Sequence, residues 1–259
     1  MGKHYVCSDI HGYLNRYLKL LDEIRLEADD TLYILGDVID RGPDSFGLLK
    51  DIMNRPNVEL FLGNHELMMH DFLLHKGMEN IWFLGSNGGK ESWSVYQRLS
   101  AKEQKAILDY ISKSWLQKLL EVDGQKFWLS HSSILDPCVY GFRDVRFDDP
   151  ALSWDDVFRV VWNSPFRQDE FENPGWYYTD DYIHLIGHVP VQRMRFRQPP
   201  CVIAHHLITN NTQDGGIWDI DGGCATSPFA PSPDMDFGGL YCLRLEKEAD
   251  GSYWSTFIQ

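Results

Sequence analysis

The sequence lacks the features that mark membrane and secreted proteins. No stretch approaches the roughly 20 consecutive apolar residues that a membrane-spanning helix needs. The chain runs directly into Tyr5-Val6-Cys7, without the basic region, apolar core and cleavage site of a secretory signal. Its five cysteines are odd in number and form no C-x-x-C pair, which argues against a disulfide framework and a cysteine zinc site. We therefore expect a cytoplasmic protein with reduced thiols and no membrane association.

Positive charge is also scarce. The 24 Lys and Arg residues are outnumbered by 38 Asp and Glu residues, which gives a formal net charge of −14. A strongly acidic protein repels nucleic-acid backbones, whose binding depends on many cationic contacts, so we expect no nucleic-acid partner. A small phosphate can still be bound by local metal ions and one or two arginines.

The chain is long and apolar enough to bury a sizeable core. It has 259 residues, of which 43% are hydrophobic and 14% aromatic, which suits one large α/β domain or two small ones. No internal repeat and no low-complexity linker divides it. We therefore expect a single domain over residues 1–259, and no feature of the sequence points to a particular oligomeric state.

The first third alternates short apolar runs with segments of helical periodicity. The apolar runs are Tyr5–Cys7, Leu32–Leu35 and Val58–Leu62, and the helical segments between them are Leu14–Ile24 and Ser45–Met53. Strands that alternate with helices in this way pair in parallel through right-handed crossovers. The fold class expected is therefore α/β.

The middle of the chain has a different pattern. Residues 67–120 are predicted to be mostly helical, with an interruption at Asn87-Gly88-Gly89. The clearest helix spans Ala101 to Leu120, because Ser100 and Glu103 form a capping box at its start. We interpret 67–120 as a helical insertion beside the functional site, within the one domain.

The last part returns to strands. Residues 135–180 are rich in Asp, Phe, Pro and Trp and predict long loops with short helices. The expected strands, in chain order, are Lys126–Ser130, Ile183–Ile186, Ile217–Ile220, Leu240–Leu245 and Tyr253–Ile258.

Five of the predicted strands end in residues that commonly bind metal ions. In chain order these ends carry Asp9 with His11, Asp37, Asn64 with His65, His131, and His188. Ligands of open α/β sheets bind at the carboxyl ends of the strands, so these residues should converge on one edge. Asp37, like Asp40 three residues on, could be an ordinary turn residue, but five such strand ends in one chain are hard to explain by turn chemistry.

Three of these residues suggest how one cation is held and a second is bridged to it. If the segment is extended, Asp9 and His11 point to the same side and can hold one cation. Asp37 carries two carboxylate oxygens and could bridge two cations. The sequence therefore predicts two ligand sets that share Asp37.

The second set adds neutral ligands. Asn64 offers a carbonyl oxygen, and His131 and His188 each offer a nitrogen. Mixed nitrogen and oxygen ligands suit Mn²⁺, Fe or Zn²⁺ better than Ca²⁺, which prefers oxygen alone. We expect two divalent ions, with Mn²⁺ as the first choice.

Three further residues suit catalysis and substrate binding. His65 is adjacent to Asn64, so its side chain should project differently and face the substrate. Asp40 can orient His65 and hold it protonated, which makes His65 a general acid for the leaving alkoxide. Arg41 is a fixed cation with a fork of donors suited to phosphate.

Three short motifs carry a family resemblance. Ser8-Asp-Ile-His-Gly12, Gly36-Asp-Val-Ile-Asp-Arg-Gly42 and Gly63-Asn-His-Glu66 resemble the signatures of the phosphoprotein phosphatase family, within the calcineurin-like metallophosphoesterases. Gly187-His-Val-Pro190 and Ser130-His131 resemble later motifs of that family. Asn87-Gly88-Gly89 and Ile220-Asp221-Gly222-Gly223 are similar to its bacterial serine/threonine protein phosphatase branch.

The resemblance implies an α/β/β/α sandwich with a dinuclear metal site. It assigns the first metal to Asp9, His11 and Asp37, and the second to Asp37, Asn64, His131 and His188. It also assigns Asp40 and His65 as the acid pair and Arg41 as a phosphate-binding residue.

The chain departs from the family pattern in three places. Ser132-Ser133 stand where the family has small residues, and Val189 stands where it has threonine. The family's second phosphate-binding arginine usually follows a tryptophan, and Arg167 is the first arginine after Trp162. We therefore interpret Arg167 as substrate-binding. The alternative is a surface pair between Arg167 and a nearby acidic residue.

The activity expected from this resemblance is hydrolysis of phosphate monoesters by attack of a metal-bridging hydroxide. The expected substrates are phosphoserine and phosphothreonine in proteins, or small phosphate esters. Asp40 and Glu66 favour this interpretation over a dinucleoside polyphosphate hydrolase of the diadenosine tetraphosphate type, which usually carries Gly-Asn-His-Asp. A non-catalytic phosphate-binding module on the same fold is the other alternative.

Overall fold

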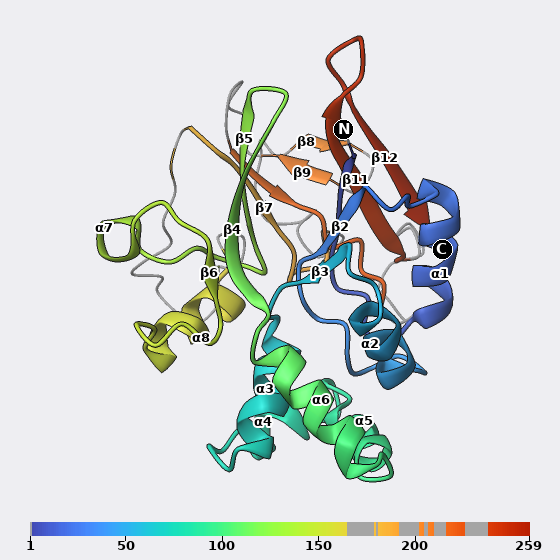
Figure 1. Cartoon of the computed structure of the whole chain (residues 1–259), viewed down its shortest axis with the longest axis vertical. Helices are drawn as coiled ribbons and strands as arrows, with labels where there is room; N and C mark the ends of the chain where they lie inside the picture. Colours follow the sequence, from blue (N-terminus) through green and yellow to red (C-terminus); the bar gives the residue numbers. More distant parts are fainter. Residues whose placement is uncertain are drawn as a thin grey trace.

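The computed structural model describes residues 2–164, 179, 181–191, 202–204, 207–209, 216–225 and 238–259. Two β-sheets stand face to face at the centre of the molecule, and helices lie outside and below them (Figure 1). The expected mixed α/β fold with two sheets is confirmed. Among the residues just given, no helix is long and apolar enough to cross a membrane.

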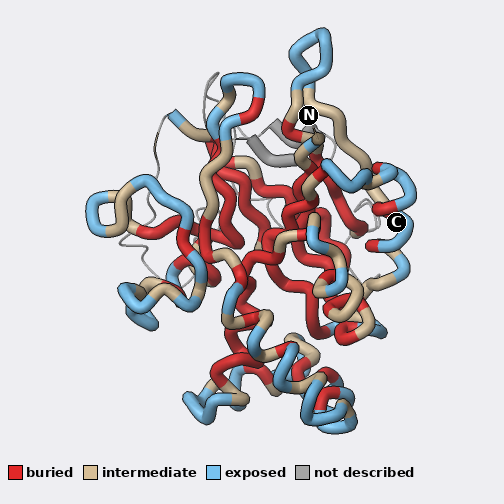
Figure 2. The backbone as a smooth tube through the Cα atoms, in the orientation of Figure 1, coloured by how far each residue is buried: buried red, intermediate tan, exposed pale blue. Residues whose placement is uncertain are grey.

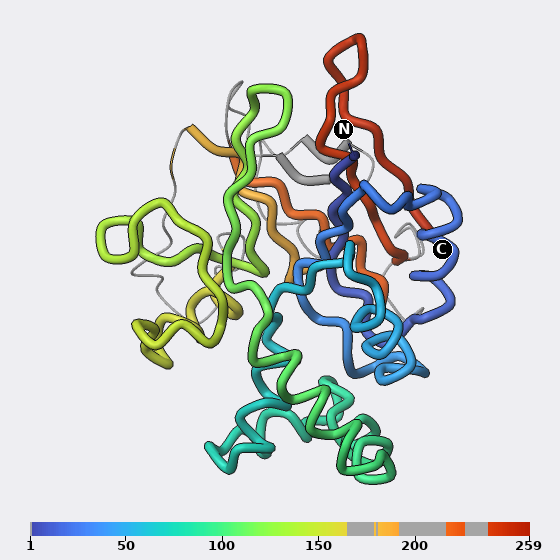
Figure 3. The backbone as a smooth tube through the Cα atoms, in the orientation of Figure 1, coloured from blue at the N-terminus to red at the C-terminus, as the bar shows by residue number. Residues whose placement is uncertain are grey.

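The five-stranded sheet is built from the two ends of the chain. In spatial order it contains β12 (Tyr253–Ile258), β11 (Leu240–Lys247), β1 (His4–Cys7), β2 (Thr31–Ile34) and β3 (Val58–Leu60). Strands β1, β2 and β3 run parallel, whereas β11 is antiparallel to β1. The blue start of the chain therefore lies beside its red end in Figure 3.

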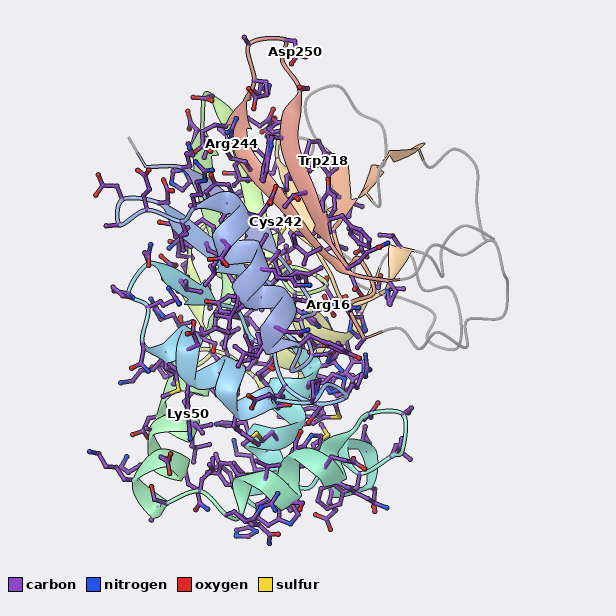
Figure 4. The ribbon with its side chains drawn as sticks, turned by 90° about the vertical axis from the view of Figure 1, so that its right-hand side faces the viewer. Arg16, Lys50, Trp218, Cys242, Arg244 and Asp250 are labelled. Carbon is purple, nitrogen blue, oxygen red and sulfur yellow. The ribbon has the colours of Figure 1, made fainter. Side chains whose placement is uncertain are left out.

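Helices α1 (Leu14–Ile24) and α2 (Ser45–Met53) form the two crossovers of this sheet. Asp44 caps α2 by accepting a hydrogen bond from the Gly47 N–H. Figure 4 shows α1 lying across the sheet in front of β11, with Arg16 at its lower part. Arg16 donates to the carbonyl oxygen of Cys224 and so links α1 to the loop after β10.

The seven-stranded sheet contributes the other half of the sandwich. In spatial order it contains β6 (Val145–Arg146), β4 (Trp115–Val122), β5 (Gln125–Ser130), β7 (Ile183–Ile186), β10 (Gly216–Asp219), β9 (Leu207–Thr209) and β8 (Val202–Ala204). Strand β7 runs parallel to both β5 and β10. The carboxyl ends of β5 and β7 therefore lie on the same edge.

Alternation along the strands divides the apolar side chains between two clusters. Val6, Tyr33 and Leu35 face the second sheet, whereas Leu32 and Ile34 face the helices. Successive side chains of a strand point to opposite faces, so one short strand fills both clusters. Figure 2 shows the result: buried residues are concentrated in the strands, and exposed residues lie in the peripheral loops and on the helix surfaces.

Four helices project from one end of the sandwich and form the expected insertion (Figure 1). They are α3 (Asn64–Leu73), α4 (Glu79–Trp82), α5 (Gly89–Tyr96) and α6 (Ala101–Ile111). The capping box at the start of α6 is confirmed: Ser100 N–H donates to Glu103 Oε2 over 2.9 Å, and Glu103 N–H donates to Ser100 Oγ over 3.3 Å.

The predicted extent of this insertion is wrong at its end. Helix α6 stops at Ile111, and the residues that follow form β4 rather than the helix expected up to Leu120. Strand β4 pairs with β5 through a two-residue turn at Asp123-Gly124, where both residues have positive φ (51° and 76°). An Asp-Gly pair between two apolar runs favours such a hairpin, so a local signal for the strand was present.

The described part of residues 135–180 has the short helices between loops that the sequence predicts. It contains α7 (Pro137–Tyr140), β6 and the nine-residue helix α8 (Trp154–Trp162). Ser153 caps α8 by accepting a hydrogen bond from the Asp156 N–H. Arg167, which the sequence singles out for substrate binding, lies outside the described residues.

Candidate metal centre

The strand ends singled out by the sequence converge on one edge of the sandwich. Loops after β1, β2 and β3 come from the five-stranded sheet, and loops after β5 and β7 come from the seven-stranded sheet. The two sheets meet there, because His131, after β5, donates from Nδ1 to the carbonyl oxygen of Leu35, after β2, over 2.5 Å. Within the seven-stranded sheet, Gly187 N–H donates to His131 O over 2.7 Å.

The loops after β1 and β2 pair along their backbones. His11 N–H donates to Asp37 O over 2.8 Å, and Gly12 N–H donates to Val38 O over 2.7 Å. The sequence suggested an extended segment for Asp9 and His11. The structure differs, because both residues have positive φ, at 53° and 49°. Strand β1 ends at Cys7, and the pairing with the second loop holds the chain in this tighter path.

Backbone strain is concentrated in the candidate site. Six of its residues have positive φ: Asp9, His11, Asp37, Asp40, Arg41 and His188. Such conformations cost of order 1–3 kcal/mol each for residues other than glycine, and they cluster at functional sites. Gly36 lets the His131 ring approach the backbone of the loop after β2, since a Cβ there would lie 2.8 Å from His131 Nδ1.

One cluster of potential metal ligands contains His11, Asp37 and His65, all buried, with ligand atoms within 4.8 Å of one another. His11 Nε2 lies 3.7 Å from Asp37 Oδ2, and His65 Nε2 lies 3.9 Å from the same oxygen. The structure thus groups His65, predicted to be catalytic, with two of the predicted ligands.

A second cluster contains Asp37, His131 and His188 within the same 4.8 Å limit. His131 Nε2 lies 3.6 Å from Asp37 Oδ1. Asn64 Oδ1 lies 3.1 Å from His131 Nε2 and 2.9 Å from His188 Nδ1. The two oxygens of Asp37 therefore face different clusters, which is the geometry that a bridging carboxylate requires.

Hydrogen bonds to backbone carbonyls set the protonation of two imidazoles. His11 Nδ1 donates to Ile39 O over 3.0 Å, and His131 Nδ1 donates to Leu35 O. Burial lowers the pKa of both rings, so both are neutral and their Nε2 atoms carry lone pairs. A carbonyl acceptor on the far nitrogen is the usual support of a metal-binding histidine.

The second cluster fits a cation by its donor set. The unprotonated His131 Nε2 faces Asn64 Oδ1, so two acceptors point at each other at 3.1 Å. A positive ion bound between two such acceptors would replace their mutual repulsion with attraction. Imidazole nitrogen with carboxylate and amide oxygen suits a first-row divalent metal.

Asp9 lies beside the clusters but makes different contacts. Its Oδ2 atom accepts from the His188 backbone N–H over 2.9 Å and from the Ser8 hydroxyl. The carboxylate thereby links the loop after β1 to the loop after β7. Its predicted role as a ligand of the first metal stays a prediction.

Arg41 bridges the two histidines of the first cluster. Its guanidinium donates to His11 Nε2 over 2.8 Å and to His65 Nε2 over 3.0 Å. Burial, with the Arg41 cation beside it, holds the pKa of His65 well below its usual range. The protonated His65 expected from the sequence is therefore not the form that this arrangement favours.

His65 and Asp40 form the predicted pair. His65 Nδ1 lies 2.7 Å from Asp40 Oδ2, and both side chains are fully buried. Trp82 Nε1 donates to the same oxygen over 2.8 Å. Burial raises the pKa of Asp40 to about 7, while hydrogen bonds from Ser92 and Trp82 oppose the rise.

Glu66 accepts hydrogen bonds from four backbone N–H groups. Its Oε2 atom accepts from the N–H groups of Asp37 (2.8 Å) and Gly63 (3.0 Å). Its Oε1 atom accepts from Val38 (2.9 Å) and Ile39 (3.2 Å). One buried carboxylate thus fixes the loop after β2 to the start of α3.

The sequence profile of the calcineurin-like phosphoesterase family matches residues 3–211 of this chain. Two curated relatives are symmetrical bis(5'-nucleosyl)-tetraphosphatases. The one from Wigglesworthia glossinidia brevipalpis is 34% identical over 125 residues, which is 48% of this chain and 41% of the relative. The one from Nitrosospira multiformis is 30% identical over 133 residues, which is 51% of this chain and 43% of the relative. The chain thus spans about two fifths of the length of these relatives.

Two solved structures share the fold over the whole chain. A protein named as a candidate diadenosine tetraphosphatase gives a TM-score of 0.60 at 16% identity, with 94% of that chain covered. A serine/threonine phosphatase from Saccharomyces cerevisiae gives 0.58 at 17% identity, with 80% of that chain covered. At such low identity these likenesses describe the fold alone.

We predict that Asp37→Asn impairs the binding of both metal ions, because its two oxygens face different clusters. His131→Ala should mainly empty the second cluster. Metal analysis of the purified proteins checks this, with His75→Asn as a control, since His75 is exposed. Two ions retained by Asp37→Asn would contradict the shared-ligand assignment.

We also predict that Glu66→Gln lowers the free energy of unfolding by about 1–3 kcal/mol, because an amide NH₂ group would face buried N–H donors and leave them unsatisfied. Urea unfolding measures the change. Glu121→Gln, at an exposed position, should stay within about 0.5 kcal/mol of the wild type. Equal urea midpoints for the two variants would contradict this stabilising role of Glu66.

Proposed function

The chain belongs to the calcineurin-like phosphoesterase family and is a metal-dependent phosphoesterase, and we propose that its substrates are dinucleoside polyphosphates of the diadenosine tetraphosphate type. The curated relatives carry this proposal: their names describe bis(5'-nucleosyl)-tetraphosphatases. The matched stretches, of 125 and 133 residues, cover only part of those proteins.

A specific observation supports a second candidate, the phosphoserine and phosphothreonine monoesters expected from the sequence. The buried His65–Asp40 pair is suited to protonate a leaving oxygen. A serine or threonine alkoxide is a far poorer leaving group than a nucleotide phosphate, so it gains more from such an acid. Glu66 accepts hydrogen bonds from backbone N–H groups, so it does not favour one of the two substrate classes over the other.

The residues suited to hold the metal ions are those of the two clusters, with Asn64 beside them and Asp37 common to both. Two divalent ions bound there would supply an activated water and neutralise phosphate charge. Which metal serves is part of the proposal, and Mn²⁺, Fe and Zn²⁺ all suit the ligands.

Arg41 is suited to bind the phosphate. Its guanidinium carries a planar fork of donors that matches two phosphate oxygens. In the structure these donors are used by His11 and His65. A bound phosphate would accept the Arg41 hydrogen bonds in place of these histidines. The cation would then leave His65 Nε2, and this nitrogen could accept a proton.

His65 would then donate from Nε2 to the leaving oxygen. Its other nitrogen, Nδ1, stays on Asp40, whose carboxylate stabilises the imidazolium. The same pair would orient the ring toward the substrate. The mechanism requires no covalent bond between the chain and the phosphate.

Direct comparison of substrates tests the proposal. We expect kcat/KM with Mn²⁺ to be higher for diadenosine tetraphosphate than for a phosphothreonine peptide by at least tenfold, or about 1.4 kcal/mol. The same preparation should hydrolyse a bis-aryl phosphate diester less well than either. A tenfold preference for the peptide would reverse the order of the two candidates, and no turnover of any phosphate ester would favour a binding module.

A second prediction concerns the acid pair. Asp40→Asn and His65→Asn should each lower kcat by about 10²–10⁴-fold for a poor leaving group, and by much less for a good one. The two losses should be non-additive because the residues act as a unit. The measurements are kcat for aryl phosphates of differing leaving group, in single and double variants.

Metal analysis of His65→Asn separates two roles for this residue. A general acid leaves the metal content unchanged, whereas a ligand of the first cluster takes an ion with it. Loss of one ion from His65→Asn would assign His65 to coordination and leave the acid role without a donor.

A further inference from the structure

Trp82 reaches the candidate site from the helical insertion. It is the last residue of α4 and is fully buried. Its indole N–H donates to Asp40 Oδ2 over 2.8 Å, and the same oxygen lies 2.7 Å from His65 Nδ1. One carboxylate oxygen therefore joins an indole of the insertion to the imidazole of the acid pair.

Aromatic packing fixes the direction of this N–H group. The Trp82 ring lies 5.3 Å from the ring centre of Phe72 and 5.3 Å from that of Phe83, its chain neighbour. Phe72 in turn contacts Trp93 of α5 at 5.1 Å. A ring held on several sides has few orientations, so the donor is aimed at Asp40 before any substrate binds.

Two glycines let the insertion approach so closely. A Cβ at Gly88, where φ is +79°, would lie 2.5 Å from the Arg41 backbone nitrogen. A Cβ at Gly89 would lie 2.3 Å from the Trp82 carbonyl oxygen and 2.5 Å from Cδ1 of its ring. The Asn87-Gly88-Gly89 turn therefore packs directly against Arg41 and Trp82.

The tautomer of His65 follows from these contacts. Arg41 donates to Nε2, so that nitrogen carries a lone pair. Asp40 Oδ2 accepts a hydrogen bond from Trp82. It can accept a second one from His65 only if the ring carries its proton on Nδ1. Ser92 of α5 also hydrogen-bonds the Asp40 carboxylate, but the indole N–H is the insertion's donor to Oδ2, the oxygen that meets His65.

We propose that Trp82 is a positioning residue for proton transfer: its indole N–H fixes the Asp40 carboxylate, which aims His65, and the Gly88-Gly89 turn is what brings the indole there. Trp82 touches neither of the two ligand clusters through its N–H. The inference rests on the proposed acid role of His65 and Asp40.

Trp82→Phe tests this, because phenylalanine keeps most of the packing and lacks the N–H. We expect kcat for phenyl phosphate to fall about tenfold, as for a lost hydrogen bond to a charged group. KM and metal content should not change, and the loss should shrink for p-nitrophenyl phosphate. In the Asp40→Asn background, Trp82→Phe should have little further effect.

A matched pair of glycine variants separates position from packing. Gly89→Ala places a methyl group against Trp82, so it should reproduce the leaving-group dependence of Trp82→Phe while the indole remains. Gly85→Ala lies in the same insertion, where a Cβ would have nothing within 4 Å, and should match the wild type. These two proteins keep the test decisive if Trp82→Phe proves unstable.

A spectroscopic measurement on metal-free protein adds a readout independent of turnover. The strongly hydrogen-bonded Nδ1 proton of His65 should give a low-field NMR resonance in the wild type that is missing in His65→Asn. In Trp82→Phe and Gly89→Ala it should broaden or move upfield, because a less fixed Asp40 exchanges this proton more freely. Gly85→Ala should keep it unchanged.

The outcomes distinguish the inference from the function beneath it. If His65→Asn shows a leaving-group-dependent loss and neither Trp82→Phe nor Gly89→Ala does, and the resonance is unchanged, the inference alone is wrong. Equal losses for both substrates together with lost metal would show that Trp82 serves only the structure, which also overturns it. If His65→Asn shows no such dependence, the acid pair is wrong and the positioning role falls with it.

Discussion

Buried negative charge around Asp37 is the constraint on which the candidate site depends. Asp9, Asp37 and Glu66 are all buried, and burial together with the two other carboxylates raises the pKa of Asp37 well above its ordinary value. Unpaired buried charge is costly, so such a cluster needs cations or hydrogen-bond donors. The fold supplies both kinds of compensation, and each kind explains a different part of the local structure.

Donors from the backbone stabilise the acidic residues Glu66 and Asp9. Glu66 takes four N–H groups, and Asp9 takes that of His188. These bonds force loops from both sheets into one arrangement, including the positive φ values at Asp37 and His188. Asp37 itself is suited to cations: its two oxygens face two clusters of histidines, and Arg41 brings its charge to the first of them. The strain in these loops is thus the consequence of assembling a cation site from five strand ends.

The helical insertion connects this centre to the question of substrate. It lies at the edge where the strand ends converge, and its indole and its glycine turn touch Asp40 and Arg41, the two residues nearest to phosphate chemistry in the proposal. The metal clusters are common to a family that serves many phosphate substrates. The residues that orient the acid and the phosphate fork are therefore where an alkoxide and a nucleotide phosphate would be treated differently.

The sequence by itself determined the elements whose signals are local. Apolar runs at strand spacing and helical periodicity predicted the parallel strands and their crossovers, and one capping box predicted the start of α6. The polar strand ends predicted that His11, Asp37, His131 and His188 lie together. Only the tertiary structure decided which side chains share a hydrogen bond across loops: Glu66 with the loop after β2, Arg41 with His65, and Trp82 with Asp40. It also decided that residues 115–122 form a strand, because pairing with β5 outweighed a helical pattern that continued past Ile111. Periodicity and turn residues act within a few positions. The partner of a buried donor or charge is instead whatever the folded chain places beside it, 42 residues away for Trp82 and Asp40 and 179 for His188 and Asp9.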